Sequence, residues 1–418
     1  MLIGKALVLS LTKDEQGCIG KPRLQRRPRP GTLTQNPERT MPQTRHAMLV
    51  DTNHDELSSQ NFVATLKSHI SSHVTGSSRT VYERRIEPRF APKTRHDVRK
   101  SLATDTHYQM ASALKRTAQE MMWDHVGGCV ERQLPDLIAR ARPKQRARGT
   151  LRLNPDLAVP RYHTAVDIHC MPGGYHSEIA GDDVYAGALY DRSIYLFSMG
   201  LRGELNDDFG QSLVAWVKRS YPKFQPQRIL DLGCSVGHGT LPWVDGFPNA
   251  EVHALDVGAP MLRYAHARAG ALGKTVHFSQ QNAEATDFPD ASFDLVVSQI
   301  ILHETSNRAL PNILHECRRL LKPGGLMVHI DGIDWKALDP YDAAVPDWDT
   351  YYNNEPFIGP LHDLDLPALT ARAGFAGDKV IYTTAPSQRR ERENQGRVEL
   401  KSGDFGNVGA FMVLAAWK

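Results

Sequence analysis

A glycine-rich turn, RILDLGCSVGHGT at residues 228–240, has the spacing that points most directly to ligand chemistry. The dinucleotide pattern G-x-G-x-x-G does not fit, because the glycines stand at Gly233, Gly237 and Gly239. The triphosphate loop does not fit either, since no Lys-Ser or Lys-Thr pair ends the turn. Instead, Asp231 stands two positions before the first glycine. An acid at the end of a strand repels phosphate and suits a ligand with a cationic, amino-acid-like end.

Strand and helix patterns alternate around this turn, which predicts a parallel sheet covered by helices on both faces. The predicted helices are 209–221, 259–273, 309–321 and 364–374. The predicted strands include 228–233, 251–257 and the segments VHFSQQNA, FDLVVSQIIL and PGGLMVHIDG. Two final strands, VIYTTA and AFMVLAAWK, follow each other without a predicted helix and should pair antiparallel at one edge. We therefore expect an α/β fold with a Rossmann-like, seven-stranded, mostly parallel sheet, an antiparallel last strand and a helical N-terminal region.

The acid and the turn together resemble motif I of the class I S-adenosylmethionine-dependent methyltransferases, acid-x-Gly-x-Gly-x-Gly. Asp256 ends the second strand, where this family places an acid on the ribose hydroxyls. Asn282 and Ala283 resemble the element that contacts adenine, usually Asp-Ala, and RRLLKPGGLMVHI resembles the turn into the fifth strand. The resemblance covers about residues 185–418 and is closest to the small-molecule subgroup typified by ubiquinone and menaquinone methyltransferases.

The resemblance implies S-adenosyl-L-methionine as the cofactor. The residues it assigns to cofactor binding are Asp231, Gly233, Cys234, Ser235, Gly237, Asp256, Val257, Met261, Asn282, Ala283 and Gln299. Asp231 is expected to order the loop or to bind the methionine ammonium. Asp256 is expected to take both ribose hydroxyls, because an acid at that position has little structural purpose. Gln299 contacts the cofactor or the acceptor, and Met261 packs either on the adenine or in the helix core.

Two positions depart from the family pattern. Ser235 replaces the middle glycine of motif I, and a side chain this small leaves room for the methionine moiety. Asn282 replaces the usual Asp and still offers a carboxamide oxygen to the adenine. Neither change removes a charge that the chemistry needs.

His303, in SQIILHET just after a strand, is the candidate catalytic residue, because the family lines the acceptor pocket there. Methyl transfer needs a general base only if the acceptor must lose a proton. We expect His303 to be that base, with Glu304 beside it to orient the imidazole; packing is the alternative role.

Two other segments should surround the site. In this architecture residues 166–200 form a lid, which Tyr185, Tyr190 or Tyr195 could line. The acidic and aromatic insertion at 331–360 is expected to shape the substrate site. His169 and His176 with nearby aspartates match no metal-site spacing, so no metal is expected.

The N-terminal third has a different character. Apolar residues recur every four positions over 107–140, which indicates one long amphipathic helix or one broken at Gly127 and Gly128. Deletion of residues 1–47 is expected to leave folding and activity intact. The predicted order is a disordered basic tail over 1–57, a helical region over 58–142, a linker and lid over 143–184 and the methyltransferase domain over 185–418.

Charge is distributed unevenly. Residues 1–150 hold 26 Lys and Arg against 14 Asp and Glu, and the remainder holds 24 against 33. Without interleaved aromatic residues, the basic half is interpreted as a solvated helical surface and not as a nucleic-acid site. The 5 scattered cysteines form no CxxC pair, which favours reduced thiols in the cytoplasm. No apolar run is long enough for a membrane helix.

These observations predict an enzyme, an S-adenosylmethionine-dependent methyltransferase acting at O, C or N of a small metabolite. An RNA or protein methyltransferase that docks through the basic helical region is one alternative. A non-catalytic cofactor-binding subunit is the other. The expected partner is a small-molecule acceptor, with no membrane and no nucleic acid, and a homodimer is a possible assembly.

Overall fold

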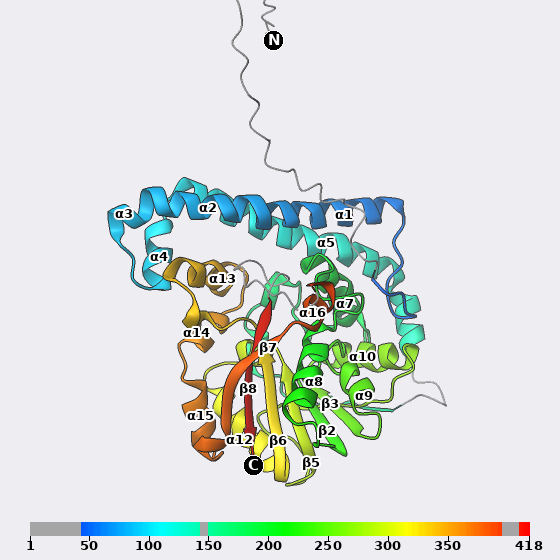
Figure 1. Cartoon of the computed structure of the whole chain (residues 1–418). Helices are drawn as coiled ribbons and strands as arrows, with labels where there is room; N and C mark the ends of the chain where they lie inside the picture. The colour runs from blue at the N-terminus through cyan, green and yellow to red at the C-terminus, as the bar shows by residue number, and fades with distance from the viewer. Residues whose placement is uncertain (1–42, 143–148, 395–408) are drawn as a thin grey trace, which may run out of the picture. The chain divides into compact units, whose positions relative to one another are not determined.

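A computed structural model describes residues 43–142, 149–394 and 409–418 and has an eight-stranded sheet at its centre (Figure 1). The strands are β1 (Thr150–Arg152), β2 (Arg228–Leu232), β3 (Glu251–Asp256), β4 (His277–Gln280), β5 (Phe293–Gln299), β6 (Leu321–Asp331), β7 (Val380–Pro386) and β8 (Ala410–Trp417). Their order in the sheet is β1-β4-β3-β2-β5-β6-β8-β7. Neighbours run parallel, except that β8 is antiparallel to both β6 and β7. The predicted fold class is confirmed.

Two details of the sheet differ from the prediction. Residues 143–184 were expected to form a linker and lid, but Thr150–Arg152 within them pairs with β4 as an edge strand, which makes eight strands and not seven. A strand of three residues is too short to show an alternating pattern. A short helix, α16 (Gln388–Asn394), also stands between β7 and β8, where none was expected.

Each central strand sends alternate side chains to opposite faces of the sheet, and helices bury both faces. Ile229 packs in the cluster under α8, α9 and α10, whereas Leu230 packs in the cluster under α12 and α15. These helices are α8 (Asp208–Ser220), α9 (Leu241–Gly246), α10 (Ala259–Ala271), α12 (Ala309–Leu320) and α15 (Leu366–Arg372). The near-continuous apolar runs of the sequence follow from this two-sided burial.

The helical region lies across the edge of the sheet at which β6 ends (Figure 1). It contains α1 (His54–His69), α2 (Thr75–Val81), α3 (Glu87–Phe90), α4 (Arg95–Leu102) and α5 (Thr106–Ala141). Helix α5 is one continuous helix, so of the two predicted alternatives the long helix is the correct one, with no break at Gly127 and Gly128. Gly127 has a packing role instead, because a Cβ atom there would lie 3.1 Å from the Tyr185 hydroxyl of α7 (Tyr185–Phe197).

The expectation of a disordered tail over 1–57 is wrong for residues 43–57, and residues 1–42 lie outside the described part. Gln43, Met48 and Val50 are buried. The Gln43 amide donates a hydrogen bond to Asp191 on α7, and His46 Nε2 lies 3.1 Å from the same carboxylate. Polar segments with few apolar residues give no sequence signal, so these long-range contacts could not be predicted.

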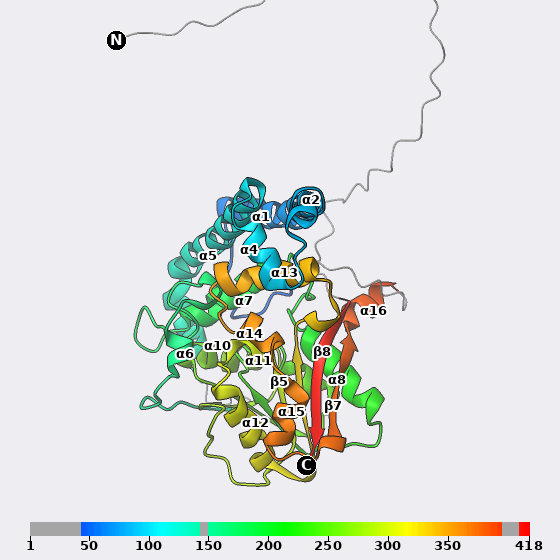
Figure 2. The same ribbon diagram turned by 90° about the vertical axis from the view of Figure 1, so that its left-hand side faces the viewer.

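The insertion after β6 folds into helices that pack on the helical region, with α13 beside α4 (Figure 2). The elements of this part and of the remaining connections are α6 (Arg161–Thr164), α11 (Ile301–Glu304), α13 (Pro340–Tyr352) and α14 (Ile358–His362), with single 3₁₀ turns at Ile168–Cys170, Trp335–Ala337 and Gly377–Lys379.

Ion pairs join the basic helical region to the acidic insertion. Arg79 on α2 contacts Asp339 at 3.0 Å and Asp342 at 2.5 Å. Arg95 on α4 lies 3.6 Å from Asp347 of the insertion and pairs at 2.8 Å with Asp363, just after it. The uneven charge of the sequence therefore serves, in part, to attach one segment of the chain to another.

Candidate active site

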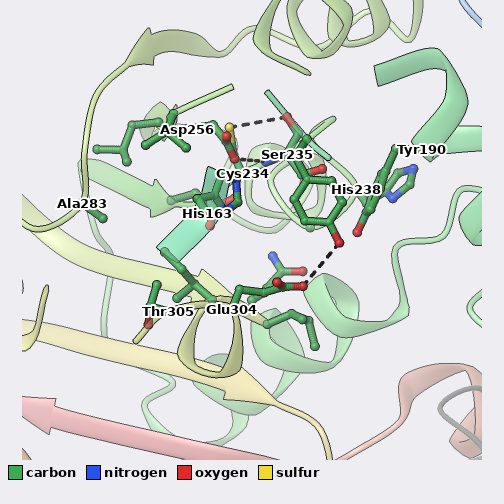
Figure 3. Close-up of a pocket in the computed structure, with 18 of the residues that line it drawn as sticks. His163, Tyr190, Cys234, Ser235, His238, Asp256, Ala283, Glu304 and Thr305 are labelled. Carbon is green, nitrogen blue, oxygen red and sulfur yellow. Dashed lines mark hydrogen bonds between the residues drawn. The ribbon is translucent and has the colours of Figure 1, made fainter. Parts of the chain in front are cut away.

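A cavity of about 1040 Å³, including its mouth, lies at the carboxyl ends of β2, β3 and β5 (Figure 3). In the sheet β2 lies between β3 and β5, so the winding of the chain reverses there. Such switch points are where open α/β sheets bind ligands. The predicted cofactor residues that line the cavity are Asp231, Gly233, Cys234, Ser235, Asp256, Val257, Asn282, Ala283 and Gln299. Folding thus brings together residues that are up to 68 positions apart in the sequence.

The turn after β2 has left-handed backbone at three positions of the predicted motif. Gly233 has φ 67° and lies so close to Ile301 that a Cβ atom would meet its methyl group at 2.8 Å. Ser235, which replaces the middle glycine, adopts φ 49°. Gly237 has φ 80° and donates its N–H to the Cys234 carbonyl at 2.8 Å. The motif therefore selects residues that tolerate positive φ.

Asp231 is buried, with only 2% of its surface exposed. Thr240 donates a hydrogen bond of 2.6 Å to one carboxylate oxygen, which connects the end of β2 to the far end of the glycine-rich turn. The other oxygen, Oδ1, is buried and has no hydrogen-bond partner among the described residues. Burial raises the pKa of Asp231 to about 7, and nearby Asp256 adds to this effect. A buried carboxylate oxygen of this kind is suited to a cationic group of a ligand.

Asp256 has a structural role in addition to the predicted contact with the ribose hydroxyls. One carboxylate oxygen accepts the backbone N–H of Ser235 at 2.9 Å, and the other accepts the N–H of Gly258 at 2.9 Å. The acid thereby connects the motif I turn to the start of α10. A carboxylate has about four lone-pair sites, so it can still accept hydroxyl donors from the cavity that it lines.

Gln299 and Asn282 complete the wall formed by the strand ends. A Cβ atom at Gly239 would overlap the Gln299 carboxamide, which explains the third glycine of the turn. The Gln299 Nε2 atom is buried and makes no hydrogen bond with any described residue. The Asn282 Oδ1 atom accepts the Glu284 N–H at 2.9 Å.

Two residues assigned to the cofactor do not line the cavity. Gly237 closes the motif I turn from behind through its bond to Cys234. Met261 is 1% exposed and belongs to the buried cluster between α5, α7 and α10. Of its two predicted roles, the structure therefore supports the helix core.

The lid contributes one of the three predicted tyrosines. Tyr190 lines the cavity and packs against the His238 ring at 5.9 Å between ring centroids (Figure 3). Tyr185 points instead toward Glu131 of α5, with 3.5 Å between the two oxygens. The Tyr195 ring packs on Gly200.

Several lining residues were missed because they come from segments without a motif. They are Tyr162, His163, Tyr175, Arg202 and His238, among others. Only His238 stands near a recognised pattern, inside the glycine-rich turn itself. Its ring nitrogen Nε2 makes a hydrogen bond of 2.8 Å to the buried Asp191, which connects the turn to α7.

His303 lies behind the cavity wall in a group that we call the carboxylate–imidazole cluster: His303, Asp331, Glu304, Glu355 and His169. The Asp331 carboxylate accepts from His303 Nδ1, so Asp331, and not Glu304 as predicted, orients the ring. His303 Nε2 lies 3.7 Å from a Glu355 oxygen and 4.0 Å from a Glu304 oxygen. Glu304 is the member that lines the cavity.

The carboxylates of the cluster set the charge of its imidazoles. Burial disfavours the imidazolium of His303, but Asp331, Glu304 and Glu355 outweigh burial and raise its pKa to about 9. In return, His303 helps to hold the pKa of Asp331 below its usual range despite burial. Burial also disfavours the imidazolium of His169, but Glu355 and Glu304 outweigh burial and raise its pKa to about 10, so both imidazoles of the cluster are protonated at neutral pH.

No metal site is found in residues 43–142, 149–394 and 409–418: no three His, Cys, Asp or Glu side chains are arranged to hold an ion. In the same residues, no helix is both long and apolar enough to cross a membrane.

Comparison with known families agrees with this geometry. A family described as "Methyltransferase domain" matches residues 229–325, from β2 into β6. The match contains the motif I turn and the ends of β3, β4 and β5, which form the cavity wall. The chain carries a class I S-adenosylmethionine-dependent methyltransferase domain, as its motifs predicted.

Curated relatives are similar over part of the chain. Malonyl-[acyl-carrier protein] O-methyltransferase of Methylococcus capsulatus is 33% identical over 147 residues, 33% of this chain and 51% of the relative. Demethylmenaquinone methyltransferase of Thermus thermophilus is 36% identical over 106 residues, 25% of this chain and 47% of the relative. A highly reducing polyketide synthase of Aspergillus terreus is 27% identical over 250 residues, 52% of this chain and 9% of the synthase. The matches span about half the length of the first two relatives.

Proposed function

We propose that this protein transfers the methyl group of S-adenosylmethionine to O, C or N of a small acceptor. The acceptor loses its proton to the carboxylate–imidazole cluster. The observation that carries the proposal is the composition of one cavity: motif residues line one wall, and Glu304 lines another. Donor and acceptor share a single space, as an in-line displacement between two bound molecules requires.

The wall at the ends of β2 and β3 fits the cofactor. When bound, S-adenosylmethionine supplies an electrophilic methyl group on a sulfonium. The unpartnered Asp231 oxygen suits the cationic amino group of its methionine end. Asp256 keeps lone pairs for the ribose hydroxyls, and the free Gln299 Nε2–H suits an acceptor atom on either molecule.

The cluster fits the removal of a proton from the acceptor. Glu304 contacts the acceptor, and His303, held by Asp331, is the base that finally keeps the proton. Without ligand His303 is an imidazolium at neutral pH, because its pKa is about 9. The positively charged sulfonium of bound S-adenosylmethionine, in the adjoining cavity, opposes protonation of His303. Cofactor binding therefore favours the neutral imidazole that a base requires. Turnover should therefore rise with pH.

Cofactor binding is the first test. Isothermal titration of the full chain with S-adenosylmethionine should show binding, and Asp231→Asn should weaken it at least tenfold, because the amide loses the negative charge. Thr240→Val is the matched control for loop order, since it removes the Asp231 contact and leaves the charge. Absence of binding by the wild type would overturn the proposal.

Acceptor identity is the second test. Transfer of labelled methyl can be measured on malonyl-acyl-carrier protein, a demethylmenaquinone and a polyketide thioester, the compound classes that the relatives' names suggest. Labelling of one class, lost in His303→Gln, would support the proposal. Binding of the cofactor with no transfer to any of the three or to a wider metabolite panel would favour the non-catalytic alternative.

A macromolecular acceptor is less favoured. Arg79 and Arg95 of the basic region are engaged by Asp339 and Asp342 of the insertion and by Asp363 just after it, and are not free for phosphates. Binding of tRNA at two salt concentrations discriminates: micromolar, salt-sensitive affinity would favour the nucleic-acid alternative. We also infer a reducing compartment such as the cytoplasm, because Cys129, Cys170, Cys234 and Cys317 are all free and buried. A homodimer remains a prediction.

A further inference from the structure

His169 is a buried imidazole on a strained turn of the lid segment. His169 and Cys170 both adopt left-handed backbone, with φ 55° and 58°. Non-glycine residues rarely do so, and consecutive examples cost free energy that the surroundings must supply. Strain of this kind gathers at functional sites, where it fixes a side chain in place.

The ring of His169 joins two carboxylates of the cluster. Nδ1 lies 2.8 Å from a Glu355 oxygen, and Nε2 lies 3.4 Å from a Glu304 oxygen. Glu304 also accepts from the Tyr175 hydroxyl at 3.4 Å, the bond drawn in Figure 3 beside Glu304. Asn353 donates to Glu355 at 2.8 Å. The imidazole therefore lies between an acid that faces the cavity and an acid that does not.

Helix α5 holds this turn from the other side. The Gln119 amide and the Trp123 indole both donate to the His169 carbonyl, at 3.0 Å and 2.8 Å. Trp123 is 1% exposed. The helical region is thereby in hydrogen-bond contact with the cluster, although its residues carry no methyltransferase motif.

We propose that His169 is a positioning residue that holds Glu304 and Glu355 beside His303, so that the lid and α5 build the proton-accepting site and do more than cover it. This inference rests on the proposed function. His169 supplies a positive charge among the acids, and Glu355 supplies a negative charge beside both imidazoles. The two residues must therefore affect the proton affinity of His303 in opposite directions.

The groups that face His303 come from every neighbouring element. They are Asp331 at the end of β6, Glu304 on α11, Glu355 before α14, His362 on α14 and His169 on the lid, with Tyr175 and Arg202 beyond them. His362 is neutral above acid pH, because burial lowers its pKa to about 4. Substitution of His169 and Glu355 therefore changes the charge around His303 at these two residues alone.

The test measures the ionisation of His303 directly and needs no acceptor. The full chain, with ¹³C-labelled histidine and saturated with S-adenosylhomocysteine, is titrated by NMR, and the His303 signal is assigned by its loss in His303→Gln. His169→Gln should raise the titration midpoint of His303 by about 1 pH unit, and Glu355→Gln should lower it by a similar amount. The double variant should return near the wild-type midpoint, because one charge of each sign is removed.

Two controls separate this inference from its alternatives. His315→Gln changes an exposed histidine on α12 and should leave the midpoint unchanged. Titration with S-adenosylhomocysteine reports whether each variant is folded; if His169→Gln is not, Glu355→Gln and the double variant still decide. Midpoints that move in the same direction, or not at all, would overturn the role of His169. Failure of the wild type to bind the cofactor or transfer methyl would instead overturn the proposed function.

Discussion

The two walls of the cavity are built in different ways. The wall that we assign to the cofactor, the cofactor wall, comes from residues 231–299, within one run of alternating strands and helices. Local hydrogen bonds shape it, such as the one that the Ser235 N–H donates to Asp256. The wall that we assign to the acceptor, the acceptor wall, contains Glu304 of α11, and side chains from the lid, the end of β6 and the loop before α14 lie behind it. Ion pairs between buried side chains hold these distant segments together.

Because the two walls are built differently, we expect one to control cofactor binding and the other to control the reaction. Backbone-shaped loops recognise a fixed ligand, so residues of the cofactor wall should control affinity for the cofactor. Buried charges depend on one another, so residues of the acceptor wall should control proton transfer and its pH dependence. The following predictions test whether the two walls are as independent as they look.

The largest effect is expected at the cluster. His303→Gln and Glu304→Gln should each lower turnover about 10²–10⁴-fold, the usual contribution of general acid–base catalysis. Affinity for S-adenosylhomocysteine should stay within about threefold, as measured by titration calorimetry. A parallel loss of affinity would show that the two walls are not independent.

The segment before α1 should be essential for folding, contrary to the expectation for deletion of residues 1–47. Loss of the buried Met48 side chain alone costs about 2–5 kcal/mol. A chain that starts at residue 51 also loses the Gln43 and His46 contacts to Asp191 and should unfold at much lower urea concentration. A chain that starts at residue 43 is the control; equal stability of both would contradict the prediction.

Asp256→Ala should weaken cofactor binding about 100-fold, since it removes a charged acceptor from two backbone N–H groups and from the ligand. Asp256→Asn should weaken it less, because the amide still accepts one hydrogen bond. Calorimetry with S-adenosylmethionine measures both. Equal affinity in Asp256→Ala and the wild type would argue against the assignment of this wall to the cofactor.

Stability should be greatest near pH 6.5. The pKa values of His303 and His169 rise to about 9 and about 10. Their contributions to the free energy of unfolding are therefore complete below pH 6.5 and disappear as pH rises toward 10. Burial lowers the pKa of His329 and His362 to about 4, so their contributions are complete above pH 6.5 and disappear as pH falls toward 4. Each group changes stability by at most about 1.4 kcal/mol per pH unit.

Urea unfolding across this pH range measures how the free energy of unfolding changes with pH on the acid side and on the alkaline side. His169→Gln should flatten the alkaline side and leave the acid side unchanged. The part of the alkaline slope that remains would come from His303, and a slope equal to that of the wild type would contradict the contribution of His169.

The smallest effect is expected at Ser235, whose φ of 49° favours glycine. Ser235→Gly should stabilise the protein by about 0.5 kcal/mol, the difference between relieved strain and added chain entropy. Ser101→Gly, at an ordinary helical position on α4, should destabilise it by a similar amount. Thermal unfolding distinguishes the two; destabilisation by Ser235→Gly would mean that the hydroxyl has a structural role.

Prediction from sequence succeeded where a structural feature depends on residues that are close together in the chain. The strand at 228–232 and the turn after it could be located because apolar runs and glycines that tolerate positive φ leave a mark in the sequence. It failed at β1, which is too short for a pattern, and at Met261, because a helix residue beside a cofactor has the same spacing as one in the core.

The sequence by itself determined the sheet, the motif I turn, the cofactor class and most residues of one wall. Each depends on spacing within a few dozen residues, which chain geometry converts directly into position. Only the tertiary structure decided that Asp331 orients His303, that His169 and Glu355 join the same cluster, and that residues 43–50 belong to the fold. Electrostatic attraction and burial act through space, so residues more than a hundred positions apart can meet without any mark in the sequence.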